Sequence, residues 1–229
     1  MNIYLDIETI PSQREDIKSD IAETISHPGN ISKAETIEKW NAEKKPAAID
    51  SKLRETALGG TFGEIICICW AIDESPVHTH YRKHNDTRWE NNELGLLSEF
   101  FTEINADLSH PQRPLPAKWI GHNITGFDLR FIWQRAVIQQ VPPPFNLPYD
   151  AKAWDDSVFD TMHEWAGSQG KDKSLDKVCK ALGLKGKGDM DGSKVYDAWL
   201  AGEDEKIKEY CADDVSKVRD IHNMLTFNA

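Results

Sequence analysis

The chain has few cysteines, no long apolar run and no excess of positive charge. Its four cysteines include no pair with CxxC spacing, which excludes the common sequence-local zinc motifs. Cys67 and Cys69 lie within an apolar run, so we expect reduced, packed thiols, with a disulfide as the minor alternative. No segment approaches the roughly 18 consecutive apolar residues of a membrane span, and the first residues lack the pattern of a signal peptide. These features predict a cytoplasmic protein without a membrane partner.

The acidic balance limits what the surface as a whole can attract. The net charge is −11, whereas a protein that grips long nucleic acid usually presents a basic surface. A cluster of acids adds negative charge of its own, however, and bound divalent cations reverse the sign of the charge at such a cluster. The charge therefore predicts modest non-specific affinity for a polymer and is compatible with a short contact at a strand end.

The pattern of apolar and turn residues predicts one α/β domain over residues 1–229. Strands are expected at residues 2–10, 64–72, 77–82 and 118–123, and the second and third form an antiparallel hairpin across the turn Asp73-Glu74-Ser75-Pro76. Helices are expected at residues 91–105, 127–140, 174–182, 193–201 and 203–227. The Pro-rich residues 110–116 read as a surface loop. Strands followed by interleaved helices indicate layers of helix around a mixed sheet.

Residues 11–60 differ in character from the rest of the chain. They are polar and charged, with few β-branched runs, and end at Gly59-Gly60. We expect an inserted helical segment here, with disorder in part of it as the alternative.

The most informative feature is a pair of carboxylates, Asp6 and Glu8, in the first predicted strand. Side chains alternate along a strand, so both acids point to one face, and their apolar neighbours indicate a segment that is at least half-buried. Two like charges side by side there are costly unless a cation neutralises them. Hard divalent metals prefer such oxygen ligands. The alternative is a solvated edge strand on which the two acids have no such role.

Two further positions set an acid at the end of an apolar element. Asp128 opens a predicted helix, where it either faces the strand ends or simply interacts well with the helix dipole. In the last predicted helix, Tyr210 is three residues before Asp213 and four before Asp214. Both acids are therefore neighbours of Tyr210 on the helix surface, and helical spacing does not choose between them.

Along the chain these motifs are D-x-E at residues 6–8, N-x-x-x-F-D at residues 123–128 and Y-x-x-x-D at residues 210–214. Together they resemble the DEDD superfamily of 3′–5′ exonucleases, in its tyrosine-containing branch. The most similar member is the proofreading exonuclease domain of family-B DNA polymerases, here without a polymerase. The resemblance covers most of the chain and leaves residues 11–60 unplaced. It implies an RNase H-like α/β fold, with a mixed five-stranded sheet flanked by helices and a helical insertion after the first strand.

The resemblance also implies roles for individual residues. Four acids would hold two divalent cations, Mg²⁺ or Mn²⁺: Asp6, Glu8, Asp128 and Asp214. This assignment chooses Asp214 over Asp213, and Tyr210 would orient the attacking water. Four residues would contact the nucleotides at the strand end: Thr9, Ile10, Asn123 and Phe127. Phe127 offers either a stacking face or a core side chain.

Three more polar residues, Lys185, Lys187 and Asp160, have positions that suggest a role near the site. Lys185 and Lys187 lie on a glycine-rich loop, where they either reach phosphates or remain solvated. Asp160 is expected to support neighbouring groups without holding an ion.

The implied activity is metal-dependent 3′–5′ hydrolysis of single-stranded DNA, by a two-metal mechanism that releases nucleoside 5′-monophosphates. Nothing in the motifs reads a 2′-hydroxyl, so RNA trimming is an alternative. A second alternative is a catalytically silent module that binds nucleic-acid ends or a protein, although all four acids are present. Neither a protein partner nor an oligomeric state follows from the sequence.

Overall fold

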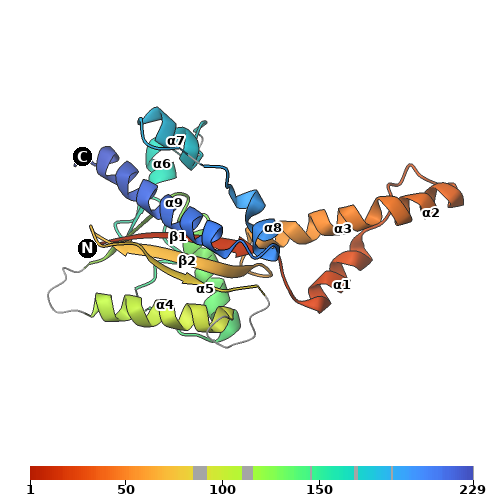
Figure 1. The fold of residues 1–229 in the computed structure, drawn as a ribbon, viewed down its shortest axis with the longest axis horizontal. Coiled ribbons are helices and arrows are strands. Elements are labelled where there is room, and N and C mark those ends of the chain that lie inside the picture. The colour runs from red at the N-terminus through yellow and green to blue at the C-terminus, as the bar shows by residue number, and fades with distance from the viewer. Residues whose placement is uncertain (85–91, 110–115, 145, 168–169, 187, 229) are drawn as a thin grey trace.

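The protein folds around a five-stranded sheet of order β3-β2-β1-β4-β5 (Figure 1). The computed structural model describes residues 1–229 except 85–91, 110–115, 145, 168–169, 187 and 229. The strands are β1 (Asn2–Ile10), β2 (Glu64–Ile72), β3 (His78–Tyr81), β4 (Lys118–Gly121) and β5 (Val158–Asp160). β1, β2 and β3 are antiparallel neighbours, whereas β4 runs parallel to β1 and β5 parallel to β4. The predicted mixed sheet and hairpin are confirmed, and the alternative of a solvated edge strand is wrong because β1 is central.

Helices cover both faces of the sheet. One face packs against α4 (Glu93–Leu108) and α5 (Asp128–Gln139), and the other against α9 (Asp204–Leu225). Three short helices lie on the α9 side: α6 (Thr161–Ala166), α7 (Leu175–Ala181) and α8 (Val195–Leu200). Because both faces are covered, all nine residues of β2 are buried. The arrangement is the α/β fold that the sequence predicts.

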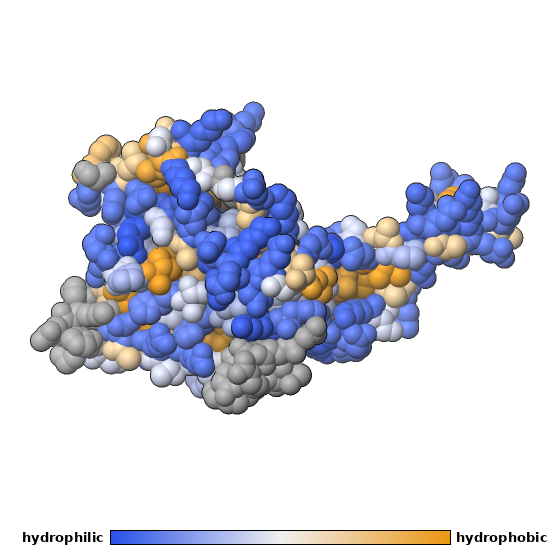
Figure 2. Space-filling view, viewed as in Figure 1, coloured by the Kyte–Doolittle hydropathy of each residue, from blue (hydrophilic) through white to orange (hydrophobic). Residues whose placement is uncertain are grey.

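The segment between β1 and β2 forms a helical arm that projects away from the sheet (Figure 1). It contains α1 (Glu15–Thr24), α2 (Ala34–Glu43), α3 (Lys45–Arg54) and the 3₁₀ turn η1 (Glu55–Leu58). Every residue of α2 and α3 is exposed or half-buried, which explains the polar composition of this segment. Figure 2 shows hydrophobic surface along the arm, where Ile17, Ile21 and Phe62 line a cavity of about 340 Å³. The predicted helical content of residues 11–60 is confirmed, while a single domain over residues 1–229 stays a prediction.

Alternation along β1 determines what each face contains. Ile3, Leu5 and Ile7 point into the core shared with α4 and α5, whereas Tyr4 and Ile10 pack on the α9 side. Asp6 and Glu8 have the same parity as Tyr4 and Ile10. They therefore face α9.

The observed boundaries differ slightly from the predicted ones. β4 ends at Gly121, two residues early, because Asn123 has a left-handed backbone conformation (φ 69°) that ends extended structure. The helix expected at residues 91–105 begins at Glu93, and residue 91 lies outside the described residues. The same holds for most of the expected loop at residues 110–116.

A buried ion pair joins the α4–α5 layer to the end of the arm. Arg135 on α5 donates to both carboxylate oxygens of Glu93 on α4, at 2.8 and 2.5 Å. It also donates to the carbonyl of Gly60, at 3.3 Å. The Glu93 carboxylate accepts in addition from the backbone N–H of Ile65 at the start of β2. This network links four segments at one end of the sheet.

Across the described part of the chain, every helix is too short or too polar to cross a membrane.

Candidate active site

The site begins with the acids of β1. Their carboxylate oxygens lie within 4.8 Å of each other and of the Cys211 sulfur on α9. Glu8 is buried and Asp6 half-buried. Oδ2 of Asp6 is itself buried, and it has no hydrogen-bond partner among the described residues. A buried carboxylate oxygen without a donor is costly, which marks this position as one where a cation fits.

Asp128 reaches the same place from the start of α5. Its side chain is buried, and Oδ1 accepts a hydrogen bond from the backbone N–H of Ile7 at 3.3 Å. Burial raises the pKa of Asp128 to about 7, although backbone hydrogen bonds to its carboxylate act in the opposite direction. Of the two alternatives for Asp128, the structure therefore supports the one in which the acid faces the ends of the strands. Its position at the start of a helix is favourable as well.

Asp160, at the end of β5, holds the turn that precedes Asp128. Its carboxylate accepts from the backbone N–H of Asn123 at 2.9 Å and from the Thr125 hydroxyl at 2.7 Å. It also caps α6 by accepting from the N–H of Met162 at 3.1 Å. These are supporting contacts, as expected for Asp160.

The last contributions come from α9. Tyr210 is half-buried and has a side-chain hydrogen bond with Asp214. Burial raises the pKa of Tyr210 well above its ordinary value, with further contributions from Glu8, Asp214 and Asp6. Its phenol therefore stays neutral at physiological pH. Helix α9 brings Tyr210 and Asp214 to the acids of β1.

A buried lysine, Lys217, contacts both Asp213 and Asp214, and the two acids differ in their exposure. Its Nζ lies 2.9 Å from Asp214 and 2.7 Å from Asp213. The largest single effect on the pKa of Lys217 is burial, which lowers it. The hydrogen bonds to Asp213 and Asp214 together have a greater effect in the opposite direction, so the pKa is raised. The Asp214 side chain is 7% exposed and that of Asp213 is 37% exposed. Asp214 is thus the one of the pair directed into the site.

The four acids act on one another electrostatically. The pKa of Asp6 is held well above its ordinary value by burial first, and then by Glu8, Asp128 and Asp214. Such mutual repulsion shows that the negative charges gather around Asp6. A set of carboxylate oxygens is what Mg²⁺ and Mn²⁺ prefer, so these residues fit a hard divalent cation.

The structure shows the surroundings of the residues that are predicted to contact the substrate. The Ile10 side chain is completely buried on the α9 side of the sheet, and its contact with a nucleotide stays a prediction. The Thr9 hydroxyl donates to the carbonyl of Ala57 at 2.9 Å, which leaves its oxygen as an acceptor. Phe127 is half-buried and lies 5.3 Å from the ring of Phe131. Contacts of Thr9, Asn123 and Phe127 with a nucleotide also stay predictions.

Two cavities border the site. One, of about 510 Å³, lies between Thr9, the end of the arm and α8, and its lining includes Arg54 and Tyr196. The other, of about 380 Å³, includes Tyr210 and Lys185 in its lining. The Lys185 side chain is 85% exposed, and Lys187 lies outside the described residues. A ligand at the acids therefore has space on either side.

Sequence reasoning did not identify Lys217 or Cys211 as neighbours of the site. A signal exists for Lys217, since it follows Asp213 and Asp214 at helical spacing. Cys211 has no local signal, because its neighbours in the fold belong to β1 and β2.

Comparison with known proteins identifies a family for most of the chain. A family model described as "Predicted 3'-5' exonuclease related to the exonuclease domain of PolB" matches residues 58–218. The matched part contains Asp128, Tyr210 and Asp214 and begins after β1. No curated protein matches the chain.

Among solved structures, the chain is similar to the family B DNA polymerase from the hyperthermophilic archaeon Pyrobaculum calidifontis. The sequences are 16% identical, with a TM-score of 0.56 over 98% of this chain and 24% of the polymerase chain. At this identity the likeness shows the fold alone, and the fold is the expected RNase H-like one. Since the family model matches more than half of the residues, the chain belongs to the family of predicted 3′–5′ exonucleases related to the exonuclease domain of PolB.

Proposed function

We propose that the protein is a metal-dependent 3′–5′ exonuclease that hydrolyses the terminal phosphodiester bond of single-stranded DNA and releases nucleoside 5′-monophosphates. The family supports the exonuclease activity. The observation that carries the finer assignment is the gathering of acids around Asp6, whose Oδ2 is buried and has no hydrogen-bond partner among the described residues. That arrangement is unfavourable for the empty protein and favourable for one that binds cations.

The proposed metal ligands are Asp6, Glu8, Asp128 and Asp214. When bound, two divalent cations would lower the pKa of the attacking water and neutralise charge on the departing 3′ oxygen. Asp6 is the natural ligand for both, because it is central in β1 and the other three acids all act on it. Asp128 and Asp214 approach it from different helices.

Tyr210 acts in this proposal as a positioning group for water. Its raised pKa excludes a role as a general base near neutral pH, since a phenol of ordinary pKa is already protonated there. The neutral hydroxyl both donates and accepts hydrogen bonds. Its hydrogen bond with Asp214 fixes its orientation toward the acids. Water held by Tyr210 is thereby aligned for attack on a bound phosphate.

The strand end is proposed to enter through the cavities beside Thr9 and Tyr210. The net charge of −11 disfavours an extended binding interface with the polymer. Recognition is therefore confined to the terminal nucleotides. DNA is preferred to RNA in this proposal because the family is related to the exonuclease domain of a DNA polymerase.

The test uses a 5′-labelled single-stranded oligonucleotide with Mg²⁺ or Mn²⁺. The wild-type protein should shorten it from the 3′ end in steps of one nucleotide. Asp6→Asn and Asp214→Asn should each lose about 10³-fold or more in rate, because each removes a charge that stabilises the reacting centre. Asp213→Asn is the matched control and should stay within about tenfold of the wild type.

Two outcomes would change the proposal. Equal activity in the wild type and Asp6→Asn would eliminate the assignment of the site. Faster shortening of an RNA strand of the same sequence would replace DNA by RNA as the substrate.

A further inference from the structure

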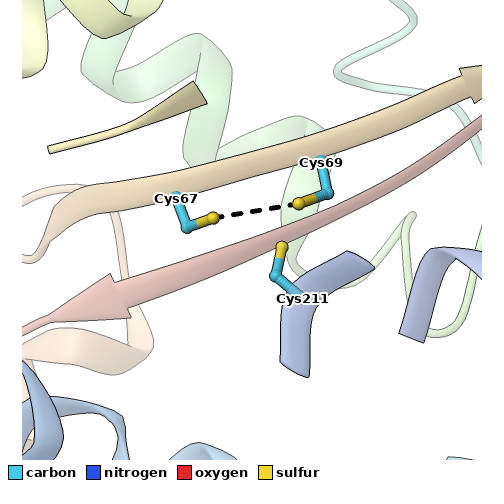
Figure 3. Close-up of side chains that lie close together, drawn as sticks. All are labelled: Cys67, Cys69 and Cys211. Carbon is cyan, nitrogen blue, oxygen red and sulfur yellow. Dashed lines mark hydrogen bonds between the residues drawn. The ribbon is translucent and has the colours of Figure 1, made fainter. Parts of the chain in front are cut away.

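Three buried cysteines meet beside the acidic site. Cys67 and Cys69 lie on β2, and Cys211 lies on α9 and points toward them (Figure 3). Their sulfur atoms all lie within 4.8 Å of one another, and those of Cys67 and Cys69 are 3.8 Å apart. All three side chains are completely buried, and all three thiols are free. Segments distant in sequence thus bring three soft ligands to one point.

The spacing of the sulfurs matches the requirements of one metal ion. A Zn–S distance of about 2.3 Å places two sulfur ligands about 3.8 Å apart around a tetrahedral ion and about 4.0 Å apart around a trigonal one. Cys67 and Cys69 already have this separation, because residues two apart on a strand point to the same face. Cys211 needs only a small side-chain adjustment to complete the set.

Neighbouring groups would support such ligands. The hydroxyl of Thr79 on β3 lies 3.2 Å from the Cys69 sulfur, where it can donate to a thiolate. Second contacts of this kind orient metal ligands and adjust their basicity. In the β1–β2 register Cys69 is opposite Asp6 and Cys67 is opposite Glu8. The sheet therefore sets a pair of soft ligands directly beside a pair of hard ones.

We propose that Cys67, Cys69 and Cys211 form a second metal site that takes one thiophilic divalent cation, such as Zn²⁺ or Cd²⁺. The thiol protons leave to solvent as the metal–sulfur bonds form, and no group is oxidised or reduced. A divalent ion leaves one negative charge on the three thiolates, whereas a monovalent soft ion would leave two, which favours the divalent ion in this buried and acidic setting. This site goes beyond the proposed nuclease function and does not depend on it.

Burial and location determine how the site should behave. Because the three thiols have no solvent exposure, a metal can enter only when α9 separates transiently from the sheet. Binding should therefore be slow. Once bound, the ion would tie α9 to β2 and raise the unfolding temperature.

The experiment titrates the reduced full-length protein with Cd²⁺ in excess Mg²⁺, which occupies carboxylates. Absorbance in the thiolate-to-cadmium charge-transfer band should saturate at one Cd²⁺ per chain. Cys69→Ala and Cys211→Ala should weaken this binding at least tenfold. Cys179→Ala removes the remaining buried cysteine, which lies outside the cluster, and should bind as the wild type does. Equal weakening by Cys179→Ala, or absence of saturation, overturns the proposal.

A second measurement needs no variant and so remains decisive if substitutions in the core prevent folding. X-ray absorption of the wild-type protein loaded with one Zn²⁺ should show three sulfur ligands at about 2.3 Å. A spectrum with oxygen and nitrogen ligands alone would mean that the ion occupies the carboxylates, and the thiol site would be rejected.

Discussion

Asp6 and Asp128 retain protons at pH values where ordinary aspartates are ionised. Burial is the main cause for both, and for Asp6 the neighbouring acids add to it. A pKa raised in the folded state means that the folded protein binds these protons more tightly than the unfolded chain. The resulting stabilisation is fully present below the ordinary pKa of about 3.9 and is lost as pH rises through the folded value.

This linkage gives a prediction for the metal-free protein. In chelator, the unfolding temperature of the wild type should fall relative to that of Asp128→Asn as pH rises from about 4 to about 7, the pKa of Asp128. Thermal unfolding of both proteins across this range provides the comparison, since groups that do not interact with Asp128 cancel. Asp6, whose pKa Asp128 raises, adds to the difference in the same direction. Parallel curves for the two proteins would show that Asp128 has an ordinary pKa.

Tyr210 provides a test of water positioning. Tyr210→Phe keeps the ring and removes the hydroxyl that bonds to Asp214. We expect kcat to fall about 10²-fold, as for the loss of one preorganised hydrogen-bonding group, with KM and the unfolding temperature nearly unchanged. Tyr81→Phe, whose hydroxyl also bonds to α9 through Asp204, is the control. A kcat equal to that of the wild type would remove Tyr210 from the mechanism.

Part of the site follows from local sequence rules. Alternation places Asp6 and Glu8 on one face, and a strand-to-helix junction places Asp128 near the strand ends. The choice between Asp213 and Asp214 does not follow, because both share a face with Tyr210 and their difference in exposure depends on how α9 packs on the sheet. Ile10 was assigned by resemblance, and its burial under α9 depends on packing across the sheet.

At the scale of elements, the buried pair Arg135–Glu93 connects α5 to α4. The side chains are 6% and 3% exposed. Arg135→Met should destabilise the protein by about 3–5 kcal/mol, because it leaves the Glu93 carboxylate buried without its partner. Denaturant unfolding measures this directly, and adding Glu93→Gln should recover part of the loss.

The control for this prediction lies on the same helix. Arg130 pairs with Asp150, and their side chains are 40% and 70% exposed. Arg130→Met should cost less than about 1 kcal/mol, since exposed ion pairs contribute little. Equal losses for the two arginine variants would contradict the account of the buried pair.

Most elements could be predicted because their signals are local. The apolar run of β2 and the turn after it define the hairpin, and helical spacing identifies α4, α5 and α9. The end of β4 could not be predicted from the sequence, because it depends on the left-handed conformation of Asn123. The proximity of Cys211 to Cys67 and Cys69 could not be predicted either, because it requires the packing of α9 on the sheet.

At the scale of the whole molecule, the negative net charge limits the affinity for nucleic acid. The chain has 38 acidic residues against 27 lysines and arginines. Binding of single-stranded DNA should therefore be weak in chelator and strengthen when Ca²⁺ occupies the acids. The slope of log K against log salt should be shallow, about −2 for three phosphate contacts. Fluorescence anisotropy measures the affinity for DNA and its dependence on salt. Tight binding without metal, with a steep slope, would contradict a contact confined to the strand end.

Acids from β1, α5 and α9 are proposed to hold divalent cations jointly. Anomalous scattering from crystals soaked in Mn²⁺ and a nucleoside 5′-monophosphate would locate these ions. We expect two manganese peaks, both within coordination distance of Asp6, with the remaining ligands from Glu8, Asp128 and Asp214. Peaks elsewhere on the surface, with these four carboxylates left without metal, would contradict this proposal.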